Sequence, residues 1–186
     1  MPSALWSRAR GEVSIYDSIP LISQVQGGQV DVTIDFYRHA AFLVYAIVED
    51  WRRVTVPEPI ETEQQLGNQL GGLGRDKRHR RRSAICVLIE WALSRRRPSM
   101  SCVIEGRGRY NAELHEKSKV RFPIANESVE VVGFYSRHHR GIFTPRDSNF
   151  HMHVRTLDNR FSGHLEVFNW EHGVMLYLPT DASHLT

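Results

Sequence analysis

The sequence predicts a strand-rich α+β fold, with mixed or antiparallel sheets and one or two helices. Two observations lead to this class. After Pro98 the apolar runs are short, and each is bounded by Gly, Pro, Asn or Asp, which is typical of antiparallel strands. Before Pro98 the texture is mixed and includes one apolar run that reads as a helix. With 41% hydrophobic and 24% charged residues, the chain can bury a core and is not a disordered polypeptide.

The N-terminal part is expected to begin with two ordered pieces, at residues 15–21 and 30–36. Between them, Gly27 and Gly28 form a turn signal. The following stretch, residues 40–48, is almost wholly apolar. It fits either a buried strand or a short buried helix, because periodicity alone does not separate the two.

The middle of the chain contains an expected irregular segment and an expected helix. Residues 55–74 hold two prolines and a glycine-rich run, and they predict a long irregular segment. Ser83 to Ser94 predicts one helix, with Ser83 as the N-cap and Pro98 as the stop. We expect a single domain over residues 1–186, with a flexible basic insertion at about 55–82.

The C-terminal half predicts a series of short strands. Each run is apolar or alternating and ends at a turn-forming residue. The expected strands are Cys102 to Glu105, Ser128 to Tyr135, Phe150 to Thr156, His164 to Trp170 and Val174 to Leu178.

Basic residues concentrate in the stretch from Arg75 to Arg97. It has a net charge of +7, whereas the remainder of the chain carries −4. Its first part, residues 75–82, could bind phosphates or serve as a nuclear address, but that part has no interleaved aromatic residues for stacking on bases. We therefore expect a solvated loop and no nucleic-acid partner.

The remaining composition predicts a cytoplasmic protein. No apolar run reaches the roughly 18 residues that a membrane-spanning helix needs, so no membrane partner is expected. The first residues lack the apolar core of a signal peptide. Cys86 and Cys102 form no CxxC motif and are expected to be reduced. The oligomeric state stays open, with a homodimer as one alternative.

The segment from residue 149 to residue 170 predicts a β-hairpin. His151 and His153 alternate with apolar residues and therefore share one face of a strand. If Asp158-Asn159 is the loop, cross-strand partners have numbers that sum to 317, which places His153 opposite His164 and His151 opposite Glu166. The other face then collects the apolar residues Met152, Val154, Leu165 and Val167.

Three imidazoles on one face of a hairpin predict a metal site. His151, His153 and His164 suit a zinc ion, with a fourth position open for water or substrate, which is the catalytic rather than the structural pattern. The alternative is that these histidines bind no metal and are simply exposed to solvent. His138 and His139 cannot both join one site, because neighbours on a strand point to opposite faces.

Several motifs surround these histidines. They are Val132-Gly133-Phe134, Gly141-Ile142, Pro145, Phe150-His151-Met152-His153 and Gly163-His164-Leu165. This arrangement resembles the alpha-acetolactate decarboxylase family, in which an aromatic-His-x-His strand is followed after ten residues by a Gly-His-hydrophobic strand. The likeness extends over most of the chain, is strongest from about 91 to 179, and describes a divergent, shortened member.

The resemblance implies a zinc-dependent lyase that decarboxylates a 2-hydroxy-3-oxo acid, in that family 2-hydroxy-2-methyl-3-oxobutanoate. It implies Zn²⁺ as the cofactor, stabilising a metal-bound enediolate, with acid/base groups nearby and an arginine for the substrate carboxylate. The chain departs from the family pattern around its expected glutamate and its expected arginine. The acid/base candidates in this chain are Glu49, Glu105 and Glu166, and the carboxylate-binding candidates are Arg107 and Arg109.

Two further hypotheses stay open. The first is a divergent metal-dependent enzyme of secondary metabolism that cyclises, enolises or decarboxylates a larger keto compound. The second is a non-catalytic relative that binds a small ligand, or an acidic partner through the Arg75 to Arg97 stretch.

Overall fold

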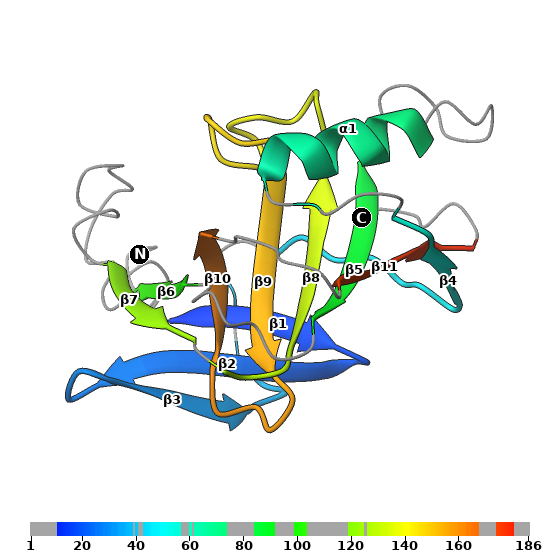
Figure 1. The fold of residues 1–186 in the computed structure, drawn as a ribbon. Helices are drawn as coiled ribbons and strands as arrows, with labels where there is room; N and C mark the ends of the chain where they lie inside the picture. Colours follow the sequence, from blue (N-terminus) through cyan, green and yellow to red (C-terminus); the bar gives the residue numbers. More distant parts are fainter. Residues whose placement is uncertain are drawn as a thin grey trace, which may run out of the picture.

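The computed structural model describes residues 11–38, 40, 43–56, 60, 62–73, 84–91, 99–103, 119–124, 126–167 and 174–180. These residues form two antiparallel sheets and one helix (Figure 1). The predicted class, a strand-rich α+β fold with antiparallel sheets, is confirmed.

A three-stranded sheet forms from the N-terminal part, in the order β1-β2-β3. Its strands are β1 (Glu12–Tyr16), β2 (Ile19–Gln26) and β3 (Gln29–Ile34). The turn at Gly27-Gly28 is confirmed, and both glycines have positive φ, as a two-residue hairpin of this kind requires. The expectation of one piece over 15–21 is wrong, because Asp17 and Ser18 also adopt positive φ and make a second hairpin there.

An eight-stranded sheet contains the rest, in the order β4-β11-β5-β8-β9-β10-β6-β7, with every neighbouring pair antiparallel. Each of the five strands expected after Pro98 overlaps an observed strand; Phe150 to Thr156 has the expected ends, and the other four have shifted ends. The bounds are β4 (Trp51–Val54), β5 (Ile85–Trp91), β6 (Ser99–Val103), β7 (Lys119–Pro123), β8 (Val129–Tyr135), β9 (Phe150–Thr156), β10 (Ser162–Val167) and β11 (Val174–Pro179).

The helix expected over Ser83 to Ser94 is wrong for its described part, which forms β5. This strand is central and pairs with β8 on one side and β11 on the other. Val87 and Ile89 are buried on one face and Cys86 on the other, so apolar residues lie on both faces of the strand. Such a run does not show the alternation of a half-exposed strand. The β-branched residues Ile85, Val87 and Ile89 also favour a strand.

The irregular segment expected over 55–74 is also wrong, because it contains α1 (Glu63–Leu73). Thr62 and Gln65 cap this helix reciprocally: the Thr62 amide donates to the Gln65 side chain at 3.0 Å, and the Gln65 amide donates to the Thr62 hydroxyl at 3.2 Å. Leu66 and Leu70, one turn apart, are fully buried. Within the described ranges, no helix has the length and apolar character that crossing a bilayer demands.

The expected buried element at 40–48 is a further correction. Its described part, residues 43–48, is neither a regular strand nor a helix, and its larger side chains are exposed. Leu43 is 41% exposed and Ile47 is 75% exposed. Val44, Ala46 and Val48 alternate with these exposed residues and are half-buried, so the segment is covered on one side at most. Apolar content alone therefore did not indicate burial here.

The large sheet has two different faces. One face packs against α1, which lies across β9, β8 and β5 in Figure 1, and it contributes most of the hydrophobic core. The opposite face carries the alternate residues of the same strands and meets the three-stranded sheet through β1 and β2. The core includes Leu66, Leu70, Val87, Ile89, Val131, Tyr135, Phe150, Met152, Val154, Leu165 and Leu176.

Candidate metal centre

The hairpin of β9 and β10 brings the three predicted histidines together. Its observed pairs, Arg155 with Ser162 and His153 with His164, confirm the predicted register. The apolar partners of the alternation, Met152 and Val154, are buried in the core on the opposite face. The histidines therefore share the face that meets the small sheet, because side chains alternate along each strand.

The three imidazoles converge closely enough to hold one metal ion. Ring centroids are 5.2 Å apart for His151 with His153, 5.2 Å for His151 with His164 and 5.6 Å for His153 with His164. One nitrogen from each ring lies within 4.8 Å of the other two. Within the part of the chain that the structure describes, no carboxylate or thiol belongs to this group.

The donor chemistry fits a borderline-soft divalent ion. The Nε2 atoms of His151 and His153 are 3.3 Å apart. Two nitrogens bound to a tetrahedral zinc at roughly 2.0–2.1 Å would be separated by about 3.4 Å. Burial lowers the pKa of both His151 and His153, and the neighbouring imidazoles lower the pKa of His153 further. The rings are therefore neutral at neutral pH, the form in which imidazole binds a metal.

The small sheet contacts this group through β1. The Ser14 hydroxyl lies 2.7 Å from Nδ1 of His153, and the Tyr16 hydroxyl donates to the backbone carbonyl of His153 at 2.9 Å. Ser14 and Tyr16 are 3% and 4% exposed, respectively. Sequence reasoning missed both residues, because no local pattern links a strand at residues 12–16 to a histidine near residue 153.

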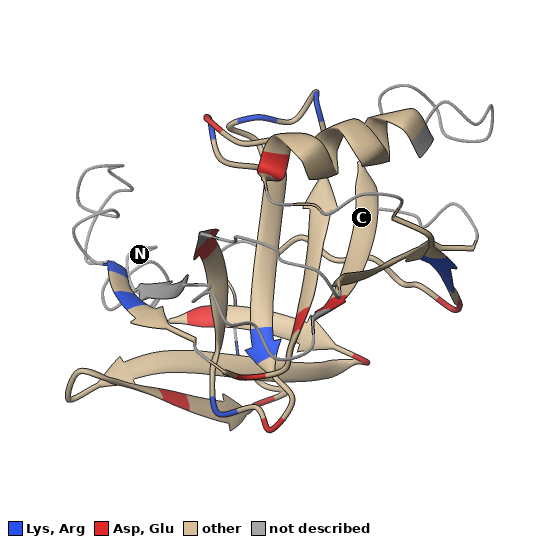
Figure 2. Ribbon diagram, viewed as in Figure 1, with Lys and Arg blue, Asp and Glu red and all other residues tan. Residues whose placement is uncertain are grey.

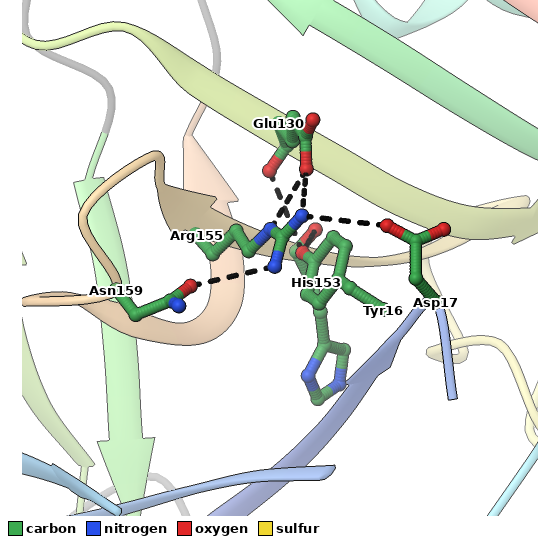
Figure 3. A network of polar contacts seen from close by, with 6 residues as sticks. All are labelled: Tyr16, Asp17, Glu130, His153, Arg155 and Asn159. Atoms are coloured by element: carbon green, nitrogen blue, oxygen red, sulfur yellow. Dashed lines mark hydrogen bonds and ion pairs between the residues drawn. The ribbon is translucent and has the colours of Figure 1, made fainter. Parts of the chain in front are cut away.

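A charged row lies beside the histidines on the same face. Glu90, Glu130 and Arg155 occupy paired positions on β5, β8 and β9, near the end of these strands that meets the small sheet (Figure 2). Figure 3 shows the contacts of Arg155. Its Nε donates to Glu130 at 2.7 Å, and its guanidinium lies 4.4 Å from the centre of the Tyr16 ring. Asn159 and Asp17 complete this network at 3.4 Å and 3.9 Å from the guanidinium.

An apolar wall borders the group on the β8 side. Val132 is paired with His153, and Leu88 of β5 follows Val132 in the same cross-strand row. Phe134 is paired with His151, and Cys86 follows Phe134. Cys86 is free, as expected, and burial raises the pKa of its thiol to about 12, so the thiol stays protonated and is a poor metal ligand. The side chain of Cys102 lies outside the described residues.

Glu166 lies close to the histidines in the chain but is engaged elsewhere. Its carboxylate lies 2.8 Å from Nζ of Lys119 and 3.5 Å from the guanidinium of Arg121. The pairs between β9 and β10 extend only to His153 with His164, and β10 is irregular between Leu165 and Val167. The predicted pairing of His151 with Glu166 is therefore not among the observed pairs.

Of the other predicted acid/base and carboxylate-binding residues, Glu49 is the one that the structure describes, and it lies away from the histidine group. Glu49 is exposed and directly precedes Asp50 and β4, the edge strand. In the sheet order β4 lies four strands from β9, which is roughly 19 Å along the sheet at about 4.8 Å per strand. Glu105, Arg107 and Arg109 lie outside the described residues.

Solved structures with a similar fold are acetolactate decarboxylases and a related protein. An alpha-acetolactate decarboxylase from Bacillus subtilis strain 168 matches with a TM-score of 0.57 and 13% identity, over 91% of this chain and 67% of the other. Acetolactate decarboxylase from Bacillus subtilis subspecies spizizenii matches with a TM-score of 0.59 and 13% identity, over 91% and 68%. A Staphylococcus aureus protein of unknown function similar to alpha-acetolactate decarboxylase matches with a TM-score of 0.56 and 10% identity, over 95% and 69%.

No protein-family model and no curated protein sequence matches this chain. The fold and the histidine group define a strand-rich α+β protein with three histidines that could hold a metal ion. Its fold is that of the alpha-acetolactate decarboxylases. The resemblance seen around the histidine motifs of the sequence is thus confirmed at the level of the fold.

The contact between Tyr16 and His153 gives a stability prediction. Tyr16→Phe keeps the ring under Arg155 but removes the hydroxyl that donates to the buried carbonyl of His153. We expect the free energy of unfolding to fall by about 1–2 kcal/mol, measured by denaturant titration with a chelator present. Tyr177→Phe is the matched control, because its hydroxyl bonds to Glu90 nearer the surface, and it should change stability by less than about 0.5 kcal/mol. Equal effects of both substitutions would contradict the prediction.

Proposed function

We propose that this protein is a zinc-dependent lyase that decarboxylates a 2-hydroxy-3-oxo acid, with His151, His153 and His164 as the metal ligands. One observation carries the proposal: three imidazoles converge on one face of a hairpin, in a fold that solved acetolactate decarboxylases also have. Acetolactate, the acid after which those decarboxylases are named, is the first substrate to test.

The chain's own residues supply two things to such a reaction: nitrogen donors for a metal ion and an apolar flank. The three histidines present nitrogen donors to one point and leave a further position open. A zinc ion there would act as a Lewis acid and orient the oxygens of a hydroxyketone. The wall of Leu88, Val132 and Phe134 makes the flank of the site apolar, which favours loss of a charged carboxylate as neutral carbon dioxide.

A second candidate is a divergent metal-dependent enzyme that acts on a larger keto compound. The observation that favours it concerns the acidic groups. Among the described residues, no carboxylate belongs to the histidine group, and Glu166 is held by Lys119 and Arg121. The proton that the reaction needs would then come from the substrate, from water or from Glu105. Glu105 remains a proposed acid/base residue, and Arg107 and Arg109 remain proposed carboxylate-binding residues.

The experiment is a decarboxylation assay on the full chain. Racemic 2-hydroxy-2-methyl-3-oxobutanoate is supplied to the zinc-loaded protein, and carbon dioxide and the hydroxyketone product are measured together. We expect turnover that is lost on removal of the metal with a chelator and restored by added zinc. Turnover of larger β-keto or α-hydroxyketone compounds alone would favour the second candidate. Zinc binding without turnover of any of these substrates would contradict both.

A further inference from the structure

The strand β1 contacts His153 at two points, although it belongs to the other sheet. The Ser14 hydroxyl lies 2.7 Å from Nδ1 of the ring, and the Tyr16 hydroxyl bonds to the backbone carbonyl of the same residue. Ser14 and His153 are 139 positions apart in the chain, and Ser14 is 3% exposed. The polar contact is therefore buried between the two sheets, where water does not compete with it.

The Ser14 contact bears on which nitrogen of His153 carries the proton. A neutral imidazole has one N–H and one lone pair, and the partner of one nitrogen decides the role of the other. If Nδ1–H donates to the Ser14 oxygen, the lone pair resides on Nε2. That atom is the one that lies 3.3 Å from Nε2 of His151, on the side where the three rings converge.

His151 lacks such a contact. Its Nδ1 atom is buried and has no hydrogen-bond partner in the structure, although the backbone of Phe143 lies near the ring. His153 is thus fixed by side-chain and backbone contacts from a second sheet, and His151 is positioned by its own strand and the neighbouring loop. A residue that hydrogen-bonds to a ligand histidine fixes the tautomer and orientation of its ring. Mutation of such a partner commonly weakens metal binding by about 10- to 100-fold.

We propose that Ser14 is a positioning residue that holds His153 as the Nδ1–H tautomer and so presents its Nε2 to a metal ion. The three-stranded sheet then helps to position a metal ligand, in addition to packing against the site. This inference rests on the proposed metal centre. It adds a residue that touches neither the metal nor the substrate and acts only through the ring of His153.

Ser14→Ala tests the inference beside two matched variants. Ser14→Thr keeps a hydroxyl at the same position. Ser23→Ala removes a fully buried hydroxyl from the adjacent strand β2, and this hydroxyl has no hydrogen-bond partner in the structure. Two readouts are used: zinc affinity by competition with a chromophoric chelator, and the imidazole ¹⁵N shifts of the metal-free proteins, which report the tautomer of His153.

We expect Ser14→Ala to bind zinc about 10- to 100-fold more weakly, and its His153 signals to lose the Nδ1–H pattern. Ser14→Thr should retain most of the affinity, and Ser23→Ala should match the wild type. Unchanged affinity and tautomer in Ser14→Ala, or an Nε2–H tautomer in the wild type, would overturn the inference. If the wild type binds no zinc, the proposed metal centre fails, and the ¹⁵N shifts alone then decide the role of Ser14.

Discussion

Replacement of His153 by alanine is expected to abolish stoichiometric metal binding. The wild type should carry about one zinc per chain, and the variant should bind zinc more than about 100-fold more weakly. This exceeds the loss caused by removing an outer partner, because a ligand itself is lost. The ring of His153 meets those of His151 and His164, and its Nδ1 meets Ser14. Metal content by mass spectrometry and zinc affinity by competition titration measure the effect.

Two further variants make the His153 result specific. His164→Ala removes a ligand from β10 rather than β9 and should cause the same loss. His138→Ala removes an exposed histidine that does not belong to the group, and it should bind zinc like the wild type. Circular dichroism of each variant shows whether the sheet still forms. Folded His153→Ala and His164→Ala proteins that both retain the wild-type affinity would refute the proposed ligands.

Gly133→Ala is expected to cause the largest loss of stability among simple substitutions near the site. Gly133 is paired with Met152, and a Cβ atom there would lie 2.5 Å from the backbone oxygen of His151 and 2.6 Å from Cγ of Met152. The backbones of β8 and β9 would have to separate, which costs about 3 kcal/mol, the upper end for overpacking. For a domain of this size, we expect the melting temperature to fall by roughly 6–12 °C.

Gly72→Ala is the matched glycine control. A Cβ atom at Gly72 would meet no atom within 4 Å, and the residue lies in α1. Alanine favours a helix over glycine, so this variant should be neutral or more stable by up to about 1 kcal/mol. Scanning calorimetry of the metal-free proteins compares the two substitutions. A Gly133→Ala protein as stable as Gly72→Ala would mean that the strands separate at little cost. That outcome would contradict a tightly held position for His151.

The hairpin that carries the histidines was predicted correctly from the sequence, because its determinants are local. The alternation of Met152 and Val154 with His151 and His153 fixes which side chains share a face. A short turn around Asp158 and Asn159 then sets the register, and the observed pairs agree with it. A slip by one residue would bury the histidines and expose the apolar residues, so pattern and register support each other.

Two elements were wrong because their local signals were ambiguous or overlooked. The apolar run from Ile85 to Ile89 suits a helix or a central strand, and only the neighbours β8 and β11 decide. In α1 the glycines suggested a loop. The capping pair of Thr62 and Gln65, followed by Leu66 and Leu70, was a usable helix signal that the glycines outweighed.

By itself, the sequence determined the strand-rich class, the hairpin register and the set of three histidines. Each of these depends on residues close together in the chain, or on one turn that brings two strands into register. Only the tertiary structure decided what surrounds the histidines: Ser14 and Tyr16 from the other sheet, the ion pair of Arg155 with Glu130, and the engagement of Glu166 by Lys119 and Arg121. These contacts join residues from different strands and sheets. Their pairing follows from how the sheets pack, and no spacing in the sequence encodes it.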